Sequence, residues 1–237
     1  MRVLSGIPEI DHLEDELAQK APALVASVDQ APTDVTALQI SPKTRGLEKL
    51  VTYPSLRRVI ARGVGDRELE QIGRITSLEH LELTDSKSAS LAALPSLSRL
   101  RILSVSNAAR LVSLEGAEKL TRLELLSASN TPRLGSIDAI RWLGNLRVLF
   151  IAGGLYRSIR IPSLHPLAGL EHLLKLVLSN VGVADRSLRP LAGLKNLRRL
   201  SLPLYFPAEE FAMLERALPE AMGDWRNLRQ SFGHSHN

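Results

Sequence analysis

The stretch SLHPLAGLEHLLKLVLSN, residues 163–180, decides the fold, because a close copy, SLRPLAGLKNLRRLSL, follows at residues 187–202. Each copy ends in the frame L-x-x-L-x-L. With Val, Ile or Ala allowed at some sites, this frame occurs eight times. The frames begin at Val35, Leu56, Leu78, Leu100, Leu120, Leu146, Leu173 and Leu197, which are 20 to 27 residues apart. Such a period is typical of architectures that stack one small unit many times.

Each frame predicts a short strand with one buried face. Side chains alternate along a strand, so the leucines point one way and the residues between them point the other way. One unit cannot bury its leucines alone, whereas stacked units bury them against each other and align their strands in a parallel sheet. We therefore expect parallel strands at residues 37–40, 58–61, 80–83, 102–105, 122–125, 148–151, 175–178 and 199–202.

A second pattern lies between the frames, as in SLAALPSLSRL (90–100), SLEGAEKLTRL (113–123) and SIDAIRWLGNL (136–146). Together the two patterns resemble the leucine-rich repeat family, specifically its short bacterial, internalin-like class. The resemblance covers roughly residues 35–205 and implies an α/β fold, a single curved, right-handed solenoid with a parallel β-sheet on its concave face. The family's asparagine is expected eight residues after the start of each frame, where this chain has other residues, such as Ala108, Ala128 and Val181. Asn107 and Asn180 stand one place early, so we expect turns that differ from the family norm.

Both ends of the solenoid need covers, because their leucines would otherwise meet water. We expect residues 1–34 to form an N-terminal capping segment, residues 35–205 about eight repeats, residues 206–225 a C-terminal helical cap and residues 226–237 a polar tail. Ile10, Leu13 and Leu17 have helical spacing, and Asp11 with Glu14 suggests a capping box. The C-terminal cap contains an apolar stripe, Phe211, Leu214 and Leu218, and we expect Trp225 to complete it.

Composition excludes several classes of protein. The 237 residues include 45 leucines, nine aromatic residues and no cysteine, which rules out disulfides and thiolate chemistry. No apolar run approaches the ~20 residues of a membrane span. The N-terminus lacks the features of a secretory signal, so we expect a cytoplasmic protein that has no membrane partner. We find no nucleophile elbow, phosphate loop or metal-binding helix, and we expect no catalytic residues, no metal and no cofactor.

Charge is unevenly distributed along the chain. Residues 1–34 carry a net charge of −5, so the remainder carries +10, most of it arginine. Basic surfaces attract nucleic acids and acidic proteins. The charge therefore leaves open a role in binding polyanions.

The predicted concave face is the candidate binding site. Its outward positions include charged side chains and an apolar group around Phe150, and residues 153–163 lengthen one repeat beside it. Insertions in repeat proteins often lie on the binding face. The candidate partner-binding residues are Arg58, His80, Glu82, Arg122, Glu124, Val148, Phe150, Tyr156, Arg157, Lys175, Val177 and Arg199. Two alternatives stay open, that the insertion folds over the apolar group or that it is a neutral surface loop.

The resemblance implies a non-enzymatic module that binds another protein through this face, and a bacterial regulatory or immunity-type protein is our hypothesis for its biology. The alternative is a protein that binds nucleic acid or another polyanion with its basic repeats. Acidic residues interrupt the basic ones on the predicted face and no aromatic platform for bases is evident, which favours the first reading. On its own, we expect the chain to be a monomer.

Overall fold

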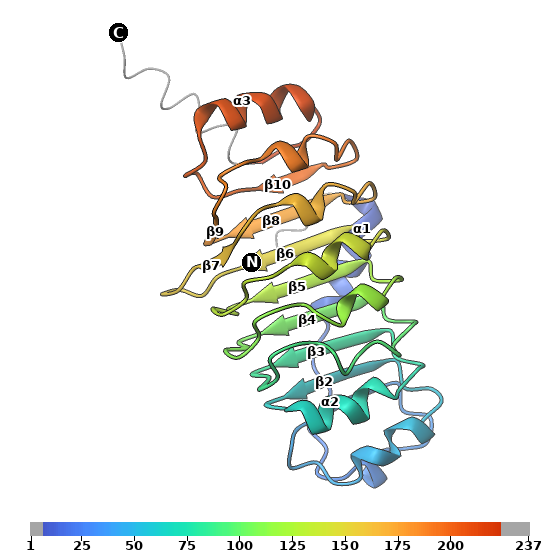
Figure 1. Cartoon of the computed structure of the whole chain (residues 1–237). Helices are drawn as coiled ribbons and strands as arrows, with labels where there is room; N and C mark the ends of the chain where they lie inside the picture. The colour runs from blue at the N-terminus through green and yellow to red at the C-terminus, as the bar shows by residue number, and fades with distance from the viewer. Residues whose placement is uncertain (1–6, 224–237) are drawn as a thin grey trace.

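The repeats stack into one open sheet. The computed structural model describes residues 7–223. Its main sheet has eight parallel strands in the order β1-β2-β3-β4-β5-β6-β8-β10 (Figure 1). They are β1 (Ala37–Ile40), β2 (Arg58–Arg62), β3 (His80–Thr84), β4 (Ile102–Ser106), β5 (Leu125–Ser129), β6 (Val148–Ala152), β8 (Lys175–Ser179) and β10 (Arg199–Ser201). The predicted solenoid with a parallel sheet is confirmed.

The fifth strand differs from its predicted position by three residues. We expected it at residues 122–125, but β5 begins at Leu125, which pairs with Ile102 and Val148 on its two neighbours. The inward residues are Leu126 and Ala128, so the frame begins at Leu123 and not at Leu120. Leu120 belongs to the preceding return segment, where it is also buried. A run rich in leucine permits both frames, and the pairing with the neighbouring strands selects one.

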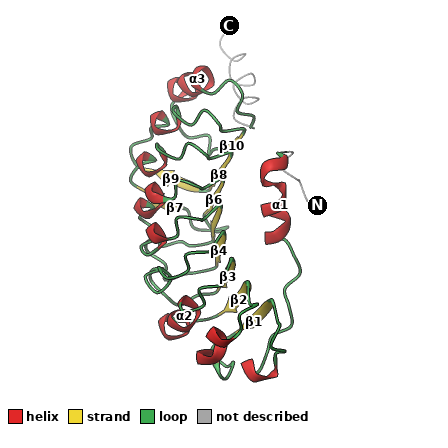
Figure 2. Cartoon of the chain, turned by 90° about the vertical axis from the view of Figure 1, so that its right-hand side faces the viewer, coloured by secondary structure: helices red, strands yellow, loops and turns green. Residues whose placement is uncertain are grey.

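Return segments run along the side opposite the sheet (Figure 2). Most contain a short 3₁₀ helix: η2 (Leu47–Thr52), η3 (Ala117–Lys119), η4 (Asp138–Trp142), η5 (His165–Leu167) and η6 (Arg189–Leu191). The second repeat instead has an α-helix, α2 (Asp66–Gly73). The leucines of strands and return segments are buried against one another in one continuous core, which extends from Val28 to Ala221. Burial of one coil therefore depends on its neighbours.

Strands β2, β3, β4, β5 and β8 each end in a tight turn whose first residue has left-handed backbone geometry. These residues are Gly63 (φ 68°), Asp85 (56°), Asn107 (54°), Asn130 (51°) and Asn180 (50°). Glycine, asparagine and aspartate tolerate this geometry best. Asn107 and Asn180 stand one place before the family's asparagine site because they form these turns. In the corrected frame the family's asparagine site in the fifth repeat holds Thr131, which is fully buried, and not Ala128.

The insertion at residues 153–163 becomes part of the solenoid wall. It contains β7 (Ile159–Ile161), which pairs in parallel with β9 (Val181–Val183) in a second, two-stranded sheet. Ile159 and Ile161 point into the core and are buried. The insertion therefore extends from the end of β6 and does not fold over the main sheet (Figure 1).

The C-terminal end is covered by α3 (Ala208–Ala217), whose Leu214 is buried together with the following Leu218. The carboxylate of Glu210 accepts hydrogen bonds from the N–H of Leu188 and the hydroxyl of Ser187, and thus fastens the helix to the last coil. Trp225 and the predicted tail at residues 226–237 lie outside the described residues.

The N-terminal segment has two parts, one that covers the end of the solenoid and one that packs on the sheet. Residues 24–31 cover the end beside β1, with bridges from Leu24 to Gln39 and from Ser27 to Arg45 and the 3₁₀ helix η1 (Val28–Gln30). The predicted helix forms as α1 (Pro8–Leu17), but it lies along the outer face of the main sheet (Figure 2). The capping box predicted from Asp11 and Glu14 was wrong, because the helix begins at Pro8, after Ile7, and no side chain caps it.

Core leucines in adjacent coils should dominate stability. Leu149 and Leu176 are fully buried and paired in register, whereas Phe150 points outward and is half-buried. We expect Leu149→Ala or Leu176→Ala to lower the free energy of unfolding by ~2–5 kcal/mol. Phe150→Ala should cost clearly less in the same urea titration. Equal losses from all three substitutions would contradict the orientation of β6.

Candidate binding face

The outer face of the main sheet, which we call the sheet face, is formed by the strand residues that point away from the core. Strand pairing aligns these residues in rows that cross the strands. The first row is Ala37, Arg58, His80, Ile102, Leu125, Val148, Lys175 and Arg199. The second row is Gln39, Ile60, Glu82, Ser104, Ser127, Phe150, Val177 and Ser201.

The middle of the first row is an apolar strip, which we define as Ile102, Leu125 and Val148. Helix α1 covers it, and the three residues are buried against Ile7, Ile10 and Leu13 in a cluster separate from the main core. Outward positions of a strand would otherwise be exposed to solvent. The strip and the apolar side of α1 therefore remove each other from water.

Ion pairs flank the apolar contact. The Lys175 ammonium contacts the Glu14 carboxylate of α1 on one side of the strip. On the other side, Glu16 of α1 lies 3.7 Å from Arg101 Nη1, and the same guanidinium donates from Nε to Glu124, at 3.0 Å. Thus two carboxylates of the helix meet two cations that border the strip.

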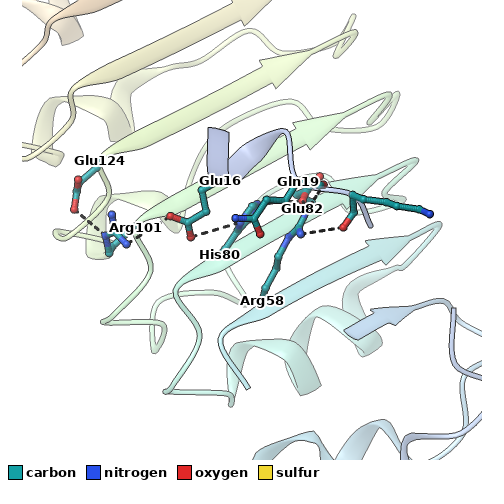
Figure 3. A network of polar contacts seen from close by, with 8 residues as sticks. Glu16, Gln19, Arg58, His80, Glu82, Arg101 and Glu124 are labelled. Atoms are coloured by element: carbon teal, nitrogen blue, oxygen red, sulfur yellow. Dashed lines mark hydrogen bonds and ion pairs between the residues drawn. The ribbon is translucent and has the colours of Figure 1, made fainter. Parts of the chain in front are cut away.

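The end of α1 lies over a cluster of Arg58, His80 and Glu82 (Figure 3). Arg58 donates to Glu82 Oε1 at 2.8 Å and to the backbone oxygen of Gln19 at 2.9 Å. His80 is only 1% exposed; its Nε2 is 3.1 Å from Glu82 Oε1 and its Nδ1 is 3.8 Å from Glu16 Oε1. The cluster is a buried polar joint between the chain's own N-terminal segment and the repeats.

The ionised form of Glu82 is favoured in this cluster. Burial acts to raise the pKa of Glu82, but the contacts with His80 and Arg58 outweigh it and hold the pKa below the ordinary value. A carboxylate stabilised in this way contributes to folding above that ordinary value. This contribution is lost as the pH falls through the lowered pKa.

Part of the predicted site is occupied from within the chain. Arg58 and Val148 are 8% and 4% exposed, and His80 is buried as well, so they are not open to a partner in this structure. Glu82 and Lys175 are partly exposed and are paired with Arg58 and Glu14. The alternation along each strand was predicted correctly for these residues. Their burial was missed, because it results from a helix that is distant in sequence.

Two predicted residues do not lie on a strand. Arg122 and Glu124 precede β5, since that strand begins at Leu125. Glu124 pairs with Arg101, while Arg122 is exposed and borders a surface hollow with Asn145. Sequence reasoning also missed Arg101 and Glu16. The one available signal for them was the opposite charge of residues 1–34 and the repeats.

The remaining predicted residues lie on the more open part of the sheet face and on the insertion. Phe150, Val177 and Arg199 are half-buried. The insertion tip, which we define as Leu155, Tyr156 and Arg157, is well exposed, with Tyr156 at 93% and Leu155 at 88%. Gly153 and Gly154 separate the tip from the end of β6 at Ala152.

A hollow of about 470 Å³ lies below the insertion tip. Its lining includes Tyr156 and three exposed arginines, Arg133, Arg157 and Arg160. The side chains present an aromatic ring among guanidinium groups, which suits anionic or aromatic groups of a ligand.

Within residues 7–223, no group of three or more His, Asp or Glu side chains could hold a metal ion. None of the helices in that part of the chain is long and apolar enough to cross a membrane.

Replacement of Glu82 by glutamine should weaken the fold in a pH-dependent way. At about pH 7 we expect Glu82→Gln to be less stable than the wild type, because the favoured carboxylate is lost. The difference should shrink as the pH falls below the ordinary pKa of glutamate and through the lowered pKa of Glu82, because the wild-type carboxylate then also becomes protonated. Urea titrations over a series of neutral to acidic pH values measure it, with the exposed Glu9→Gln as control. A difference independent of pH would contradict the assignment.

Comparisons with known proteins give the fold. No protein-family model matches the sequence, and no curated protein matches it either. Among solved structures, the chain is similar to an internalin (inlF) from Listeria monocytogenes, at 17% identity and a TM-score of 0.62, over 81% of this chain and 54% of that one. It is also similar to a leucine-rich repeat protein of Leptospira interrogans, at 16% identity and a TM-score of 0.57, over 92% of this chain and 63% of that one.

A second internalin (inlC2) of Listeria monocytogenes matches at 21% identity and a TM-score of 0.54, over 75% of this chain and 76% of that one. The chain thus spans about half to three quarters of the length of these structures. At such identities the likeness concerns the fold. The structure is an internalin-like leucine-rich repeat solenoid.

Proposed function

We propose that the chain is a non-enzymatic module that binds another protein through the open part of the sheet face and the insertion tip. The observation that carries this proposal is the exposure of Leu155 and Tyr156 at the tip. Large apolar side chains held in water on a rigid wall are typical of partner sites. Tyrosine and arginine, which adjoin one another at the tip, are enriched among residues that dominate binding energy.

The solenoid supports this proposal physically. The tip is attached to the wall by the pairing of β7 with β9, so its position relative to β6 is set before a partner arrives. A preordered surface loses less conformational entropy on binding. Phe150 and Val177, adjacent across β6 and β8, provide a second half-exposed apolar contact on the sheet face.

A polyanion, nucleic acid included, is the second candidate for the ligand. The specific observation in its favour is the group of three exposed arginines around the hollow below the tip. The two candidates differ in salt dependence. Affinity for nucleic acid falls steeply with ionic strength because bound counterions are released. Affinity for a protein through Leu155, Tyr156 and Phe150 should change much less between about 50 and 200 mM salt.

Alanine at the tip should weaken a complex without harming the fold. We expect Tyr156→Ala to reduce affinity by more than ~1 kcal/mol, since the ring is exposed in the free chain and would be buried by a partner. Partners captured by the wild type are identified by mass spectrometry, and calorimetric titration then gives the affinity of each variant. Phe150→Ala should act in the same direction.

The matched control is Trp142→Ala. Trp142 is an exposed aromatic residue, at 65%, in η4. This 3₁₀ helix belongs to the return segments, which run along the side opposite the sheet (Figure 2). The substitution should leave the affinity unchanged. A complex that tolerates Tyr156→Ala but is weakened by Trp142→Ala would show that binding uses the other side of the solenoid.

A further inference from the structure

Helix α1 packs on the repeats through side chains and does not pair with the strands of the sheet. The backbone–backbone hydrogen bonds of residues 10–19 run within the helix and its last turn. Just beyond the helix, the backbone oxygen of Gln19 accepts a hydrogen bond from the side chain of Arg58. The segment joins the sheet further along, where the N–H of Val25 donates to the backbone oxygen of Gln39 at 3.1 Å. The helix contacts the sheet through side chains, so its departure would leave the strand ladder intact.

The anchor of the segment is separate from the helix. The bridges from Leu24 and Ser27, and the buried Val28, keep residues 24–31 on the end of the main core. The apolar contact of α1 instead belongs to its own cluster with Ile102, Leu125 and Val148. Departure of the helix would therefore leave the end of the solenoid covered.

The strip beneath α1 has the features of a receptor for a helix. Three apolar side chains lie side by side on adjacent strands, and Lys175 and Arg101 border them. The helix supplies matching groups, with Ile10 and Leu13 in the apolar contact and Glu14 and Glu16 beside the cations. An amphipathic helix laid in an apolar groove is a recurrent mode of peptide recognition.

We propose that the strip Ile102–Leu125–Val148 is a binding site for an acidic amphipathic helix of a partner protein, and that α1 occupies this site until such a helix displaces it. This inference rests on the proposed function and names the class of partner. The partner helix would carry apolar residues spaced as Ile10 and Leu13 are, followed by carboxylates placed as those of Glu14 and Glu16 are. Because α1 is tethered, it competes at a high effective concentration.

The test uses the full chain and a labelled peptide of residues 7–20, IPEIDHLEDELAQK. The variant Ile10→Ala with Leu13→Ala weakens the hold of α1 on the strip. Fluorescence anisotropy should show that the peptide binds this variant at least tenfold more tightly than the wild type. Equal affinity for both chains would overturn the proposal. Should the variant fail to fold, Glu14→Lys with Glu16→Lys loosens the helix through charge alone.

A charge exchange locates the bound peptide. Lys175→Glu in the loosened chain should weaken binding about tenfold, and a peptide with Glu14→Lys should restore it. The matched control is a peptide with Glu9→Lys, which changes charge equally at an exposed position and should not restore binding. Failure of the exchange would overturn the assignment of the site.

A second copy of the chain is the competing occupant. Light scattering of the wild type at the concentrations used should show a monomer. A dimer that is lost in the loosened variant would assign the strip to an exchanged α1 and overturn the partner-helix proposal. The outcome is distinct from failure of the proposed function, which is judged from Tyr156→Ala. If that substitution weakens a complex while the peptide does not bind, the interaction module stands without the helix site.

Discussion

A coil of this solenoid has no core of its own, and that constraint shapes the rest of the molecule. The leucines of each strand and return segment lie between those of the neighbouring coils, so burial is shared along the stack. The ends must be covered for the same reason. Residues 24–31 cover one end and α3 covers the other, where Glu210 fastens the helix to the backbone of the last coil. The result is a rigid wall with a long, regular face.

The alternation of side chains along each strand also places apolar residues on that face. Every strand that points leucines inward must point other residues outward, and in the middle coils these are Ile102, Leu125 and Val148. An apolar strip of this kind would be exposed without a cover. Helix α1 provides the cover, and its carboxylates meet the cations at the borders of the strip. The N-terminal segment therefore serves the sheet face as well as the end of the stack.

Local periodicity was sufficient to predict most of the fold and insufficient for the site. The ends of seven strands were predicted to within one residue, because their frames allow a single register. The fifth repeat allows two registers, because it contains Leu120, Leu123, Leu125 and Leu126. The return pattern SLEGAEKLTRL ends at Leu123, as its counterparts end at Leu100 and Leu146, and it contained the information needed. Arg58 and His80 are buried by contacts with residues about forty to sixty positions away in the sequence. The repeat pattern holds no information about such contacts.

Basic side chains border both the strip that α1 covers and the open insertion tip. The acidic N-terminal segment offsets part of the basic charge of the repeats, and it does so at Lys175 and Arg101, beside the strip. The arginines around the insertion tip are exposed and take no part in these ion pairs. Release of α1 would uncover apolar surface and leave two further cations without their helix carboxylates. A partner that replaces the helix must then cover the apolar strip and also pair with the two cations. These two requirements favour an acidic amphipathic segment over a purely apolar or a purely anionic one.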